Sequence, residues 1–412
     1  MKILFLNTYA DFATSGGGAE ITIHNLTQGI LRQGHEPVVL ATSKKAGLEQ
    51  SKLQGVRIFH AGLRNVYWPQ QKVRQNPILR LLWHSVDSYN ILMRPLLRQV
   101  LEAERPDVVS IHNLPGWSAA AWETIASTDI PIVQVLHDSY AICPKSTMYT
   151  QHGNCAGQCF SCRVLRLPHR RVSNHVSAVV GVSQFILDRH LQEGYFTRVP
   201  IQRTIHNVRD PVDLGINTDT LRARGSPFRV GYIGRIDHTK GIELLLNAFA
   251  KANIPDAELW IAGGGNEVYE DNLRVRWQTD KIRFMGRMSQ RDFFPNIDVV
   301  VAPSLWQEPL GMVVAEALAF GKPVIASRRG GIPEMIQDGR NGILFDPTKI
   351  DELVNAIHKL HADEIFRRTM CLRAMDSARP FMDHNKWITQ YIEIYAQVLA
   401  ARDSTTTKSS EQ

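Results

Sequence analysis

The chain has 412 residues, a formal net charge of +7, 44% hydrophobic residues and 21% charged residues. This length predicts two domains of roughly 200 residues each. The composition excludes a disordered chain, a collagen-like fibre and a disulfide-dense miniprotein. Because no run of 18 apolar residues occurs, a membrane-spanning helix is not expected. Five cysteines are an odd, low count that fits a reducing compartment, so we expect a cytoplasmic protein.

The first half predicts alternating strands and helices. It opens with a short apolar strand at residues 3–7, too short for a signal peptide. A glycine-rich loop at 16–18 then leads into a helix at 19–33. Further apolar segments typical of strands lie at 37–41, 108–111, 132–136 and 178–182. Short apolar strands separated by helices indicate a parallel sheet with helices on both faces.

The second half restarts this pattern after a polar linker at 209–227. Its expected strands lie at 228–233, 258–262, 282–285, 299–302, 323–326 and 342–344. The predicted fold class is therefore α/β, with two doubly wound, Rossmann-like domains at 1–208 and 209–383 that face a ligand-binding cleft. The apolar helix at 387–399 must pack on another element, and the polar tail at 404–412 is expected to be disordered.

The positive charge is concentrated in the first half. Residues 1–208 hold 21 Lys and Arg against 13 Asp and Glu, whereas residues 209–412 hold 26 against 27. Within 64–101, only Asp87 offsets six basic residues that interleave with Trp and Leu: Arg64, Lys72, Arg74, Arg80, Arg94 and Arg98. This pattern fits a basic surface helix with a buried apolar face, or an interfacial helix on an anionic membrane. Nucleic acid is not an expected partner, because no nucleic-acid-binding module is recognisable.

Two cations follow the first predicted strand of the second half. Arg235 and Lys240 lie in the segment GRIDHTKG at 234–241. Arginine offers a planar fork to a diphosphate and lysine adds a mobile point charge. Such cations stabilise the negative charge that develops on a leaving diphosphate. The alternative is a pair of solvated loop charges.

The segment EPLGMVVAE at 308–316 is the second candidate. Gly311 and Met312 stand at a predicted helix start, where free N–H groups and the helix dipole receive phosphate. Glu308 lies just ahead of that helix and Glu316 about a turn inside it. A carboxylate in this apolar helix needs a partner, and sugar or ribose hydroxyls are suitable. For Glu308 the alternative is an ordinary acidic residue near a helix N-terminus.

Four motifs in this order resemble glycosyltransferase family 4. They are G-R-x4-K-G, E-P-x-G-x4-E, then G-G-I-P-E at 330–334 and D-G-x-N-G-I-L-F at 338–345. The resemblance covers nearly the whole chain, and its most specific part is the pair Glu308 and Glu316. It implies the GT-B fold and retaining sugar transfer without a metal or another cofactor. It also implies that the last helix, about 384–403, packs back on the first domain.

The resemblance also implies roles for individual residues. Arg235 and Lys240 would bind the donor diphosphate, Glu316 the nucleotide ribose and Glu308 the donor sugar. The implied donor-binding set is Arg235, Lys240, Gly311, Met312, Glu316, Gly17 and Gly18. One departure is Gly264, where many relatives carry an acidic residue, and this leaves the nucleotide base open.

Two histidines follow strands of the first half, where the resemblance places sugar or acceptor contacts. They are His112, after 108–111, and His137, after 132–136. Both are candidate catalytic residues together with Glu308, and the alternative for each histidine is a structural role. Retaining transfer in this family is usually drawn as front-face, with the leaving phosphate taking the acceptor proton, so that no protein base is required.

Four cysteines follow His137 closely, with the spacing C-x11-C-x3-C-x2-C. They are Cys143, Cys155, Cys159 and Cys162. A structural zinc site, unbonded structural thiols and redox or disulfide chemistry all remain open. Similar cysteine-bearing loops in some relatives suggest a loop that shapes the acceptor site.

Together these features predict a cytoplasmic, metal-independent, retaining glycosyltransferase. It would move a sugar from a nucleotide-diphosphate sugar to a hydroxyl of a sugar or lipid-linked glycan acceptor. The basic, Trp-bearing stretch suggests surface polysaccharide or glycoconjugate assembly, with the protein peripheral on the inner face of the membrane. The alternative is a catalytically inactive, membrane-associated GT-B scaffold. An NAD-dependent oxidoreductase is disfavoured because the glycines at 16–18 lack the G-x-G-x-x-G spacing.

Overall fold

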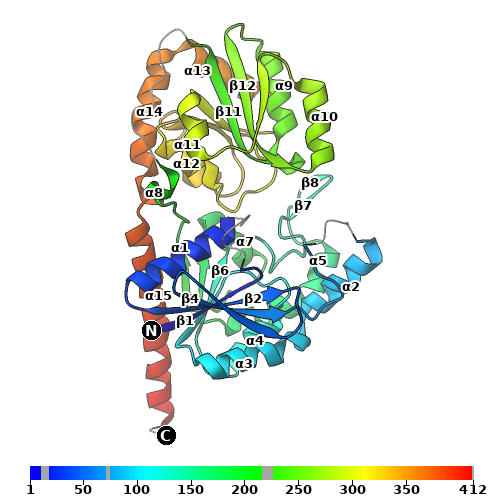
Figure 1. The fold of residues 1–412 in the computed structure, drawn as a ribbon, viewed down its shortest axis with the longest axis vertical. Coiled ribbons are helices and arrows are strands. Elements are labelled where there is room, and N and C mark those ends of the chain that lie inside the picture. The colour runs from blue at the N-terminus through cyan, green and yellow to red at the C-terminus, as the bar shows by residue number, and fades with distance from the viewer. Residues whose placement is uncertain (11–17, 71–74, 216–225, 411–412) are drawn as a thin grey trace. The chain divides into compact units, whose positions relative to one another are not determined.

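The chain folds into two compact units, which the computed structural model describes over residues 1–10, 18–70, 75–215 and 226–410 (Figure 1). Unit 1 comprises Met1–Met148, Cys155–His206 and Asn385–Gln412. Unit 2 comprises Tyr149–Asn154 and Asn207–His384. Each unit has its own sheet, as the repeated strand–helix pattern predicts.

Unit 1 is built on an eight-stranded sheet in the order β10-β9-β6-β5-β1-β2-β4-β3. Its strands are β1 (Lys2–Asn7), β2 (Glu36–Ser43), β3 (Leu48–Leu53), β4 (Val56–Gly62), β5 (Val108–Ile111), β6 (Ile132–Leu136), β9 (Ala178–Gly181) and β10 (Ile201–Thr204). All neighbours are parallel except β3, which runs antiparallel to β4. The hairpin between them turns at Gln54 and Gly55, which both have positive φ, as a two-residue type I′ turn requires.

Eight α-helices accompany this sheet among the described residues of unit 1. They are α1 (Gly18–Arg32), α2 (Pro77–Ser88), α3 (Arg94–Glu104), α4 (Ala120–Ala126), α5 (Phe160–Leu165), α6 (Leu167–Val172), α7 (Gln184–Gln192) and, after unit 2, α15 (His384–Ser410), which begins one residue before the unit boundary; the short 3-10 turn at Ser173–His175 follows α6.

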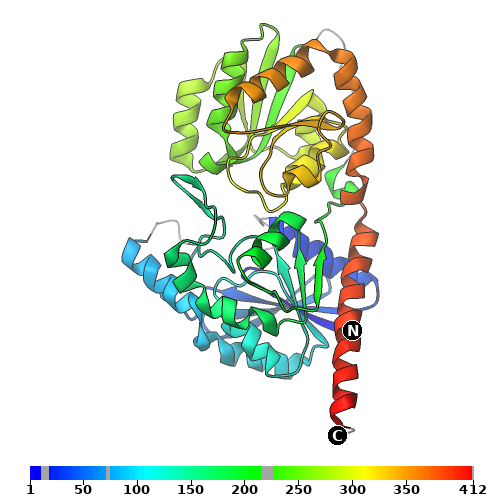
Figure 2. The same ribbon diagram turned by 180° about the vertical axis from the view of Figure 1, so that it is seen from behind.

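Helix α15 returns the chain to unit 1 after the whole of unit 2 (Figure 2). Trp387, Tyr391 and Tyr395 recur at every fourth position, on one face of the helix, and all three are buried. The apolar segment expected to pack on another element does so. The backbone of residues 404–410, expected to be disordered, continues as helix.

Unit 2 contains a six-stranded, fully parallel sheet in the order β13-β12-β11-β14-β15-β16. Its strands are β11 (Phe228–Ile236), β12 (Ala257–Gly265), β13 (Ile282–Gly286), β14 (Val299–Ala302), β15 (Val324–Ser327) and β16 (Gly342–Phe345). Its helices are α8 (Pro211–Leu214), α9 (Ile242–Ala252), α10 (Glu267–Trp277), α11 (Gln290–Phe293), α12 (Met312–Ala319), α13 (Ile350–Ala362) and α14 (Glu364–Ala378). A small hairpin, β7 (Tyr149–Thr150) and β8 (Gly153–Asn154), also belongs to this unit.

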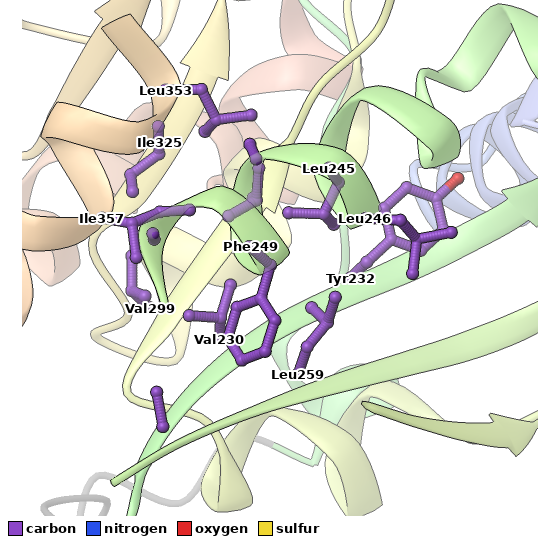
Figure 3. Close-up of a cluster of buried hydrophobic side chains, with 14 of the residues drawn as sticks. Val230, Tyr232, Leu245, Leu246, Phe249, Leu259, Val299, Ile325, Leu353 and Ile357 are labelled. Carbon is purple, nitrogen blue, oxygen red and sulfur yellow. The ribbon is translucent and has the colours of Figure 1, made fainter. Parts of the chain in front are cut away.

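The core of unit 2 fixes the strand ends from which its loops emerge. Figure 3 shows side chains of α9 and α13 meeting those of β11, β12, β14 and β15. Leu245 of α9 and Ile357 of α13 are fully buried in this cluster. Burying a side chain of this size stabilises the fold by roughly 1.5–3 kcal/mol. Helix α9 is therefore held firmly, and so is the loop that connects it to β11.

Two of the three glycines at the end of β12, Gly263 and Gly265, have a steric explanation. Gly263 lies opposite Gly234, and Gly265 opposite Ile236, in the register with β11. A Cβ on Gly263 would lie 1.8 Å from the Gly234 carbonyl oxygen, and one on Gly265 equally close to that of Ile236. These glycines are therefore required by the close approach of two strands.

Candidate functional site

Lys240 and Glu308, which lie far apart in the sequence, form an ion pair in unit 2. Lys240 Nζ lies 2.6 Å from Glu308 Oε1, and the Ser304 hydroxyl donates to the same oxygen over 2.6 Å. Glu308 is only 5% exposed. The Lys240 ammonium also lies 5.3 Å from the Trp306 ring centroid. The site thus holds a buried carboxylate whose charge is balanced by one lysine.

Backbone contacts between two loops bring this pair together. Strands β11 and β14 are neighbours, so the loops that follow them meet at one edge of the sheet. The Thr239 carbonyl accepts from the N–H groups of Leu305, at 2.8 Å, and Trp306, at 3.3 Å. Gly241 has a φ of +74°, and a Cβ there would lie 2.0 Å from the Pro303 carbonyl oxygen. Only glycine permits this approach.

The motif at 330–334 secures Glu308 from another side. The Gly331 N–H donates to the Glu308 carbonyl over 2.8 Å, and the Gly330 N–H donates to Gln307 Oε1 over 2.5 Å. Gly330 has a φ of +58°, and a Cβ there would lie 1.8 Å from the Glu308 carbonyl oxygen. This loop therefore clamps the backbone of the proposed sugar-contacting residue.

Arg235 keeps its guanidinium largely in solvent. Its side chain is 60% exposed, and Nη2 lies 3.4 Å from Asp237 Oδ2. Asp237 is otherwise engaged in the loop, because its Oδ1 accepts from the Thr239 N–H over 2.8 Å. An exposed arginine of this kind can reach a phosphate without losing a buried partner.

Gly311 and Met312 stand at the start of α12, as expected. Gly311 is the N-cap residue, with a φ of +89°, and Met312 is the first helical residue. Both are only partly buried. Because the first N–H groups of a helix have no intrahelical acceptor, this end of α12 suits an anionic group.

Glu316 is buried in α12, and its partners come from the protein. Arg209 Nε donates to Glu316 Oε1 over 2.6 Å, and Gln290 Nε2 donates to Oε2 over 3.3 Å. The pattern correctly predicts that this carboxylate needs partners, but it missed Arg209, which lies in the expected linker. A ribose bound to Glu316 would share the carboxylate with these two side chains.

Of the two glycines assigned to the first loop, only Gly18 is among the described residues. Gly17 lies outside the described residues. Gly18 is the first residue of α1 in unit 1, and a Cβ on it would meet no atom within 4 Å. No steric requirement for glycine is visible at position 18.

In unit 1, His112 and His137 form a hydrogen-bonded pair at the carboxyl ends of β5 and β6. His112 Nδ1 lies 2.8 Å from His137 Nε2, and the two rings are stacked at 5.1 Å between centroids. Both line a small cavity together with Asp138 and Tyr140. The two predicted histidines are therefore brought together.

A chain of hydrogen bonds continues from this pair into the last helix. The Tyr395 hydroxyl of α15 donates to Ser110 Oγ over 2.9 Å, and Ser110 Oγ lies 3.2 Å from His112 Nε2. When the Ser110 hydroxyl donates a hydrogen bond to His112 Nε2, the ring proton of His112 is on Nδ1. Nδ1 then donates a hydrogen bond to His137 Nε2. Both of these ring lone pairs are then occupied within the protein.

Burial keeps both histidines uncharged near neutral pH. It lowers the pKa of His137 to about 4. Burial, with a smaller contribution from His137, lowers the pKa of His112 well below its usual value. Neutral imidazoles that are hydrogen-bonded to each other can orient sugar hydroxyls. Because His112 Nδ1 and His137 Nε2 are engaged in this hydrogen bond, neither of these two atoms is free to act as a base.

The cysteine loop holds free thiols. All five cysteines are unbonded, and Cys162 Sγ donates to Cys143 Sγ over 3.9 Å. This hydrogen bond lowers the pKa of the Cys143 thiol to about 6. Across the described residues, no group of three or more His, Cys, Asp or Glu side chains is arranged to hold a metal ion. In the same part of the chain, every helix is too short or too polar to cross a membrane.

Comparisons with known proteins define the class and then the family. Two doubly wound units of this kind make a GT-B protein, and solved GT-B structures superpose on nearly the whole chain. Sucrose-phosphate synthase from Thermosynechococcus elongatus has a TM-score of 0.75 and 19% identity, covering 97% of this chain and 99% of its own. Anabaena HepE in complex with UDP and glucose has a TM-score of 0.67 and 22% identity, covering 96% and 99%.

Family models identify the chain itself. The model described as Glycosyltransferase Family 4 matches residues 16–211, and the one described as Glycosyl transferases group 1 matches residues 217–374. A Klebsiella pneumoniae protein, described as an uncharacterised 42.6 kDa protein in the cps region, is 27% identical over 81% of this chain and 87% of its own. The chain belongs to the family 4, group 1 glycosyltransferases.

Proposed function

We propose that this glycosyltransferase moves a sugar from a nucleotide-diphosphate donor to a hydroxyl acceptor with retained anomeric configuration and without a metal ion. The observation that carries the proposal is the Lys240–Glu308 pair, with the exposed Arg235 near the end of β11, five residues before Lys240, and the start of α12 four residues after Glu308. These groups offer two cations and free helix N–H groups to a diphosphate, and one carboxylate to a sugar.

The two cations support the absence of a metal requirement. When the bond between the anomeric carbon and the phosphate oxygen breaks, negative charge develops on the diphosphate. Lys240 and Arg235 would stabilise that charge, which is the task of a divalent ion in metal-dependent transfer.

The contacts of Glu308 support retention by a front-face route. Its Oε1 already accepts from Lys240 and Ser304, which makes the carboxylate a poor nucleophile. The Glu308 carboxylate can instead stabilise positive charge that develops on the sugar ring. In the proposed step the acceptor oxygen bonds to the anomeric carbon on the face that the diphosphate leaves. The acceptor proton passes to the leaving phosphate oxygen, and so the mutually bonded His112 and His137 need not remove it.

We further propose that the donor-binding residues are Arg235, Lys240, Gly311, Met312 and Glu316, and that the reaction serves surface polysaccharide or glycoconjugate assembly on the cytoplasmic side of a membrane. The relative from the Klebsiella cps region supports that role. The HepE complex with UDP and glucose makes UDP-glucose the first donor to try. Five free cysteines agree with a reducing compartment.

The test is a transfer assay with UDP-, GDP- and ADP-hexoses as donors and p-nitrophenyl hexosides as acceptors, with and without excess EDTA. We expect one donor to react, the product to keep the donor's anomeric configuration by NMR, and EDTA to leave the rate unchanged. An inverted product would refute retention, and a rate that EDTA abolishes and divalent ions restore would refute metal independence. No transfer from any donor would favour the inactive scaffold.

A further inference from the structure

Unit 1 carries a cluster of exposed apolar side chains on α2, α5 and the start of α6. Phe160 is 83% exposed, Ile78 is 72% exposed and Leu81 is 58% exposed. We name this cluster the α2–α5 face and define it by Ile78, Leu81, Leu82, Phe160, Val164 and Leu167. Large apolar side chains gathered in one exposed patch mark an interaction site in soluble proteins.

The members of the α2–α5 face lie on one side of their helices. Ile78, Leu81 and Leu82 follow helical i, i+3, i+4 spacing, so they share one face of α2. The opposite face of α2 is buried through Trp83 and Asp87. Figures 1 and 2 both show α2 beside α5, the helix that carries Phe160 and Val164. Two segments more than 70 residues apart therefore form one surface.

Buried polar contacts join these helices into a rigid support. The Ser88 hydroxyl at the end of α2 donates to the Leu165 carbonyl at the end of α5. Beneath them Asp87 and Arg166 are both fully buried, with Arg166 Nη2 4.0 Å from Asp87 Oδ2. The Arg166 guanidinium lies 4.1 Å from the ring centroid of Tyr140, whose hydroxyl donates to Asp87. The surface is therefore preformed.

The positive charge of the two segments that carry this face favours an anionic binding partner. Residues 50–86 and 139–187, which contain α5, α6 and all of α2 except its last two residues, hold no Asp or Glu, and the one acidic residue of α2, Asp87, is fully buried. They hold eleven basic residues: Lys52, Arg57, Arg64, Lys72, Arg74, Arg80, Lys145, Arg163, Arg166, Arg170 and Arg171. Arg163 on α5 and Arg170 and Arg171 on α6 are exposed beside the apolar cluster. A second copy of this face would bring like charges together, which disfavours self-association.

We propose that the α2–α5 face docks on an anionic phospholipid bilayer. The six apolar side chains enter the boundary between headgroups and acyl chains, and the neighbouring arginines contact headgroup phosphates. This inference goes beyond sugar transfer, because it rests on unit 1 alone and holds whichever donor unit 2 binds. The proposed membrane-binding surface includes α5 and α6, whereas the sequence pattern pointed to residues 64–101 only.

The test is co-sedimentation of the full chain with vesicles of phosphatidylcholine, alone or with about 30% phosphatidylglycerol. We expect binding to the anionic vesicles, weakened by high salt, and at least about tenfold weaker binding to neutral ones. The variant Leu82→Glu/Phe160→Glu should bind the anionic vesicles at least about tenfold more weakly. The matched control, Val275→Glu/Ile365→Glu, adds the same charge at exposed apolar positions of unit 2 and should bind like the wild type.

Two results would overturn the proposal. One is wild-type binding that is absent, or that both double variants reduce equally. The other is a dimer in light scattering that Leu82→Glu/Phe160→Glu dissociates, which would make a second copy the occupant. Because all four substituted side chains are exposed, circular dichroism and the unfolding midpoint should match the wild type, so lost binding is not lost folding.

Discussion

At the scale of single residues, the ion pair of Lys240 with the buried Glu308 predicts two effects that can be measured separately, one on turnover and one on the free energy of unfolding. Lys240→Met should lower turnover by at least about 10²-fold, because a cation facing the diphosphate is lost. It should also destabilise the fold by roughly 1–3 kcal/mol, because a buried carboxylate loses its counter-charge. The measurements are turnover and urea unfolding.

The double variant Lys240→Met/Glu308→Gln is the control for this prediction. Removing both charges should recover part of the lost stability and none of the lost turnover. Recovery of turnover in the double variant would show that Lys240 acts only as a structural partner of Glu308.

What the sequence could predict at this scale depends on local motifs. Lys240 and Glu308 lie in short sequence motifs that are typical of diphosphate and sugar binding, so their place in the donor site could be predicted. Arg209 could not, because it contacts Glu316 across 107 positions and no local pattern marks it. The glycines at 263 and 265 also carry a requirement that only the register with β11 makes visible.

At the scale of elements, the β7–β8 hairpin makes a second prediction. Asn154 Nδ2 donates to the Leu305 carbonyl over 2.7 Å, and its Oδ1 accepts from the Gln307 N–H over 3.0 Å. Asn154→Ala would leave both backbone groups of the loop before Glu308 without these bonds. We expect turnover to fall about tenfold, since a loosened loop misplaces the carboxylate.

Thr150→Ala, in the same hairpin, is the matched control. The Thr150 hydroxyl bonds only within the hairpin, to Gly153 and His152, in the contacts described for it. Its turnover should stay close to that of the wild type. Equal losses in the two variants would mean that the hairpin acts as a whole and that Asn154 has no special part.

The elements themselves were largely predictable where apolar strands alternate with helices, which includes all six strands of the parallel sheet of unit 2. Strands β3, β4 and β10 of unit 1 were not predicted. The sequence of β3, LEQSKL, is polar, and its side chains are mostly exposed at the sheet edge. The assignment of the β7–β8 hairpin to unit 2 was not predictable either. It depends on contacts such as that of Asn154 with Leu305, which lies 151 residues later.

At the scale of the whole molecule, buried histidines make stability depend on pH. Burial lowers the pKa of His190 to about 4, as it does for His137, and lowers those of His112 and His169 further. The unfolded chain therefore binds more protons between pH 4 and pH 6.5. The stability that the four histidines contribute should be complete above about pH 6.5 and fall as pH falls toward 4, by up to about 1.4 kcal/mol per pH unit for each histidine. Burial raises the pKa of Asp87 to about 7 and that of Asp138 to about 6, and these two carboxyls oppose part of that fall.

His169→Phe tests this dependence. Neither ring nitrogen of His169 has a hydrogen-bond partner among the described residues, and the ring packs edge-on against Trp122. We expect the variant to be at least as stable as the wild type at pH 7 and to lose less stability at pH 5, by urea unfolding. Parallel losses in the two proteins would contradict the prediction.

The most direct test of the donor site is a thermal-shift titration of the full chain with UDP, GDP, ADP and their sugar conjugates. One nucleotide should raise the unfolding midpoint by about 5 °C or more at a large excess over its dissociation constant, because it binds the folded state alone. The shift should be much smaller in Lys240→Ala and Glu316→Gln. No shift with any nucleotide, or equal shifts in wild type and variants, would contradict a donor site built on these residues.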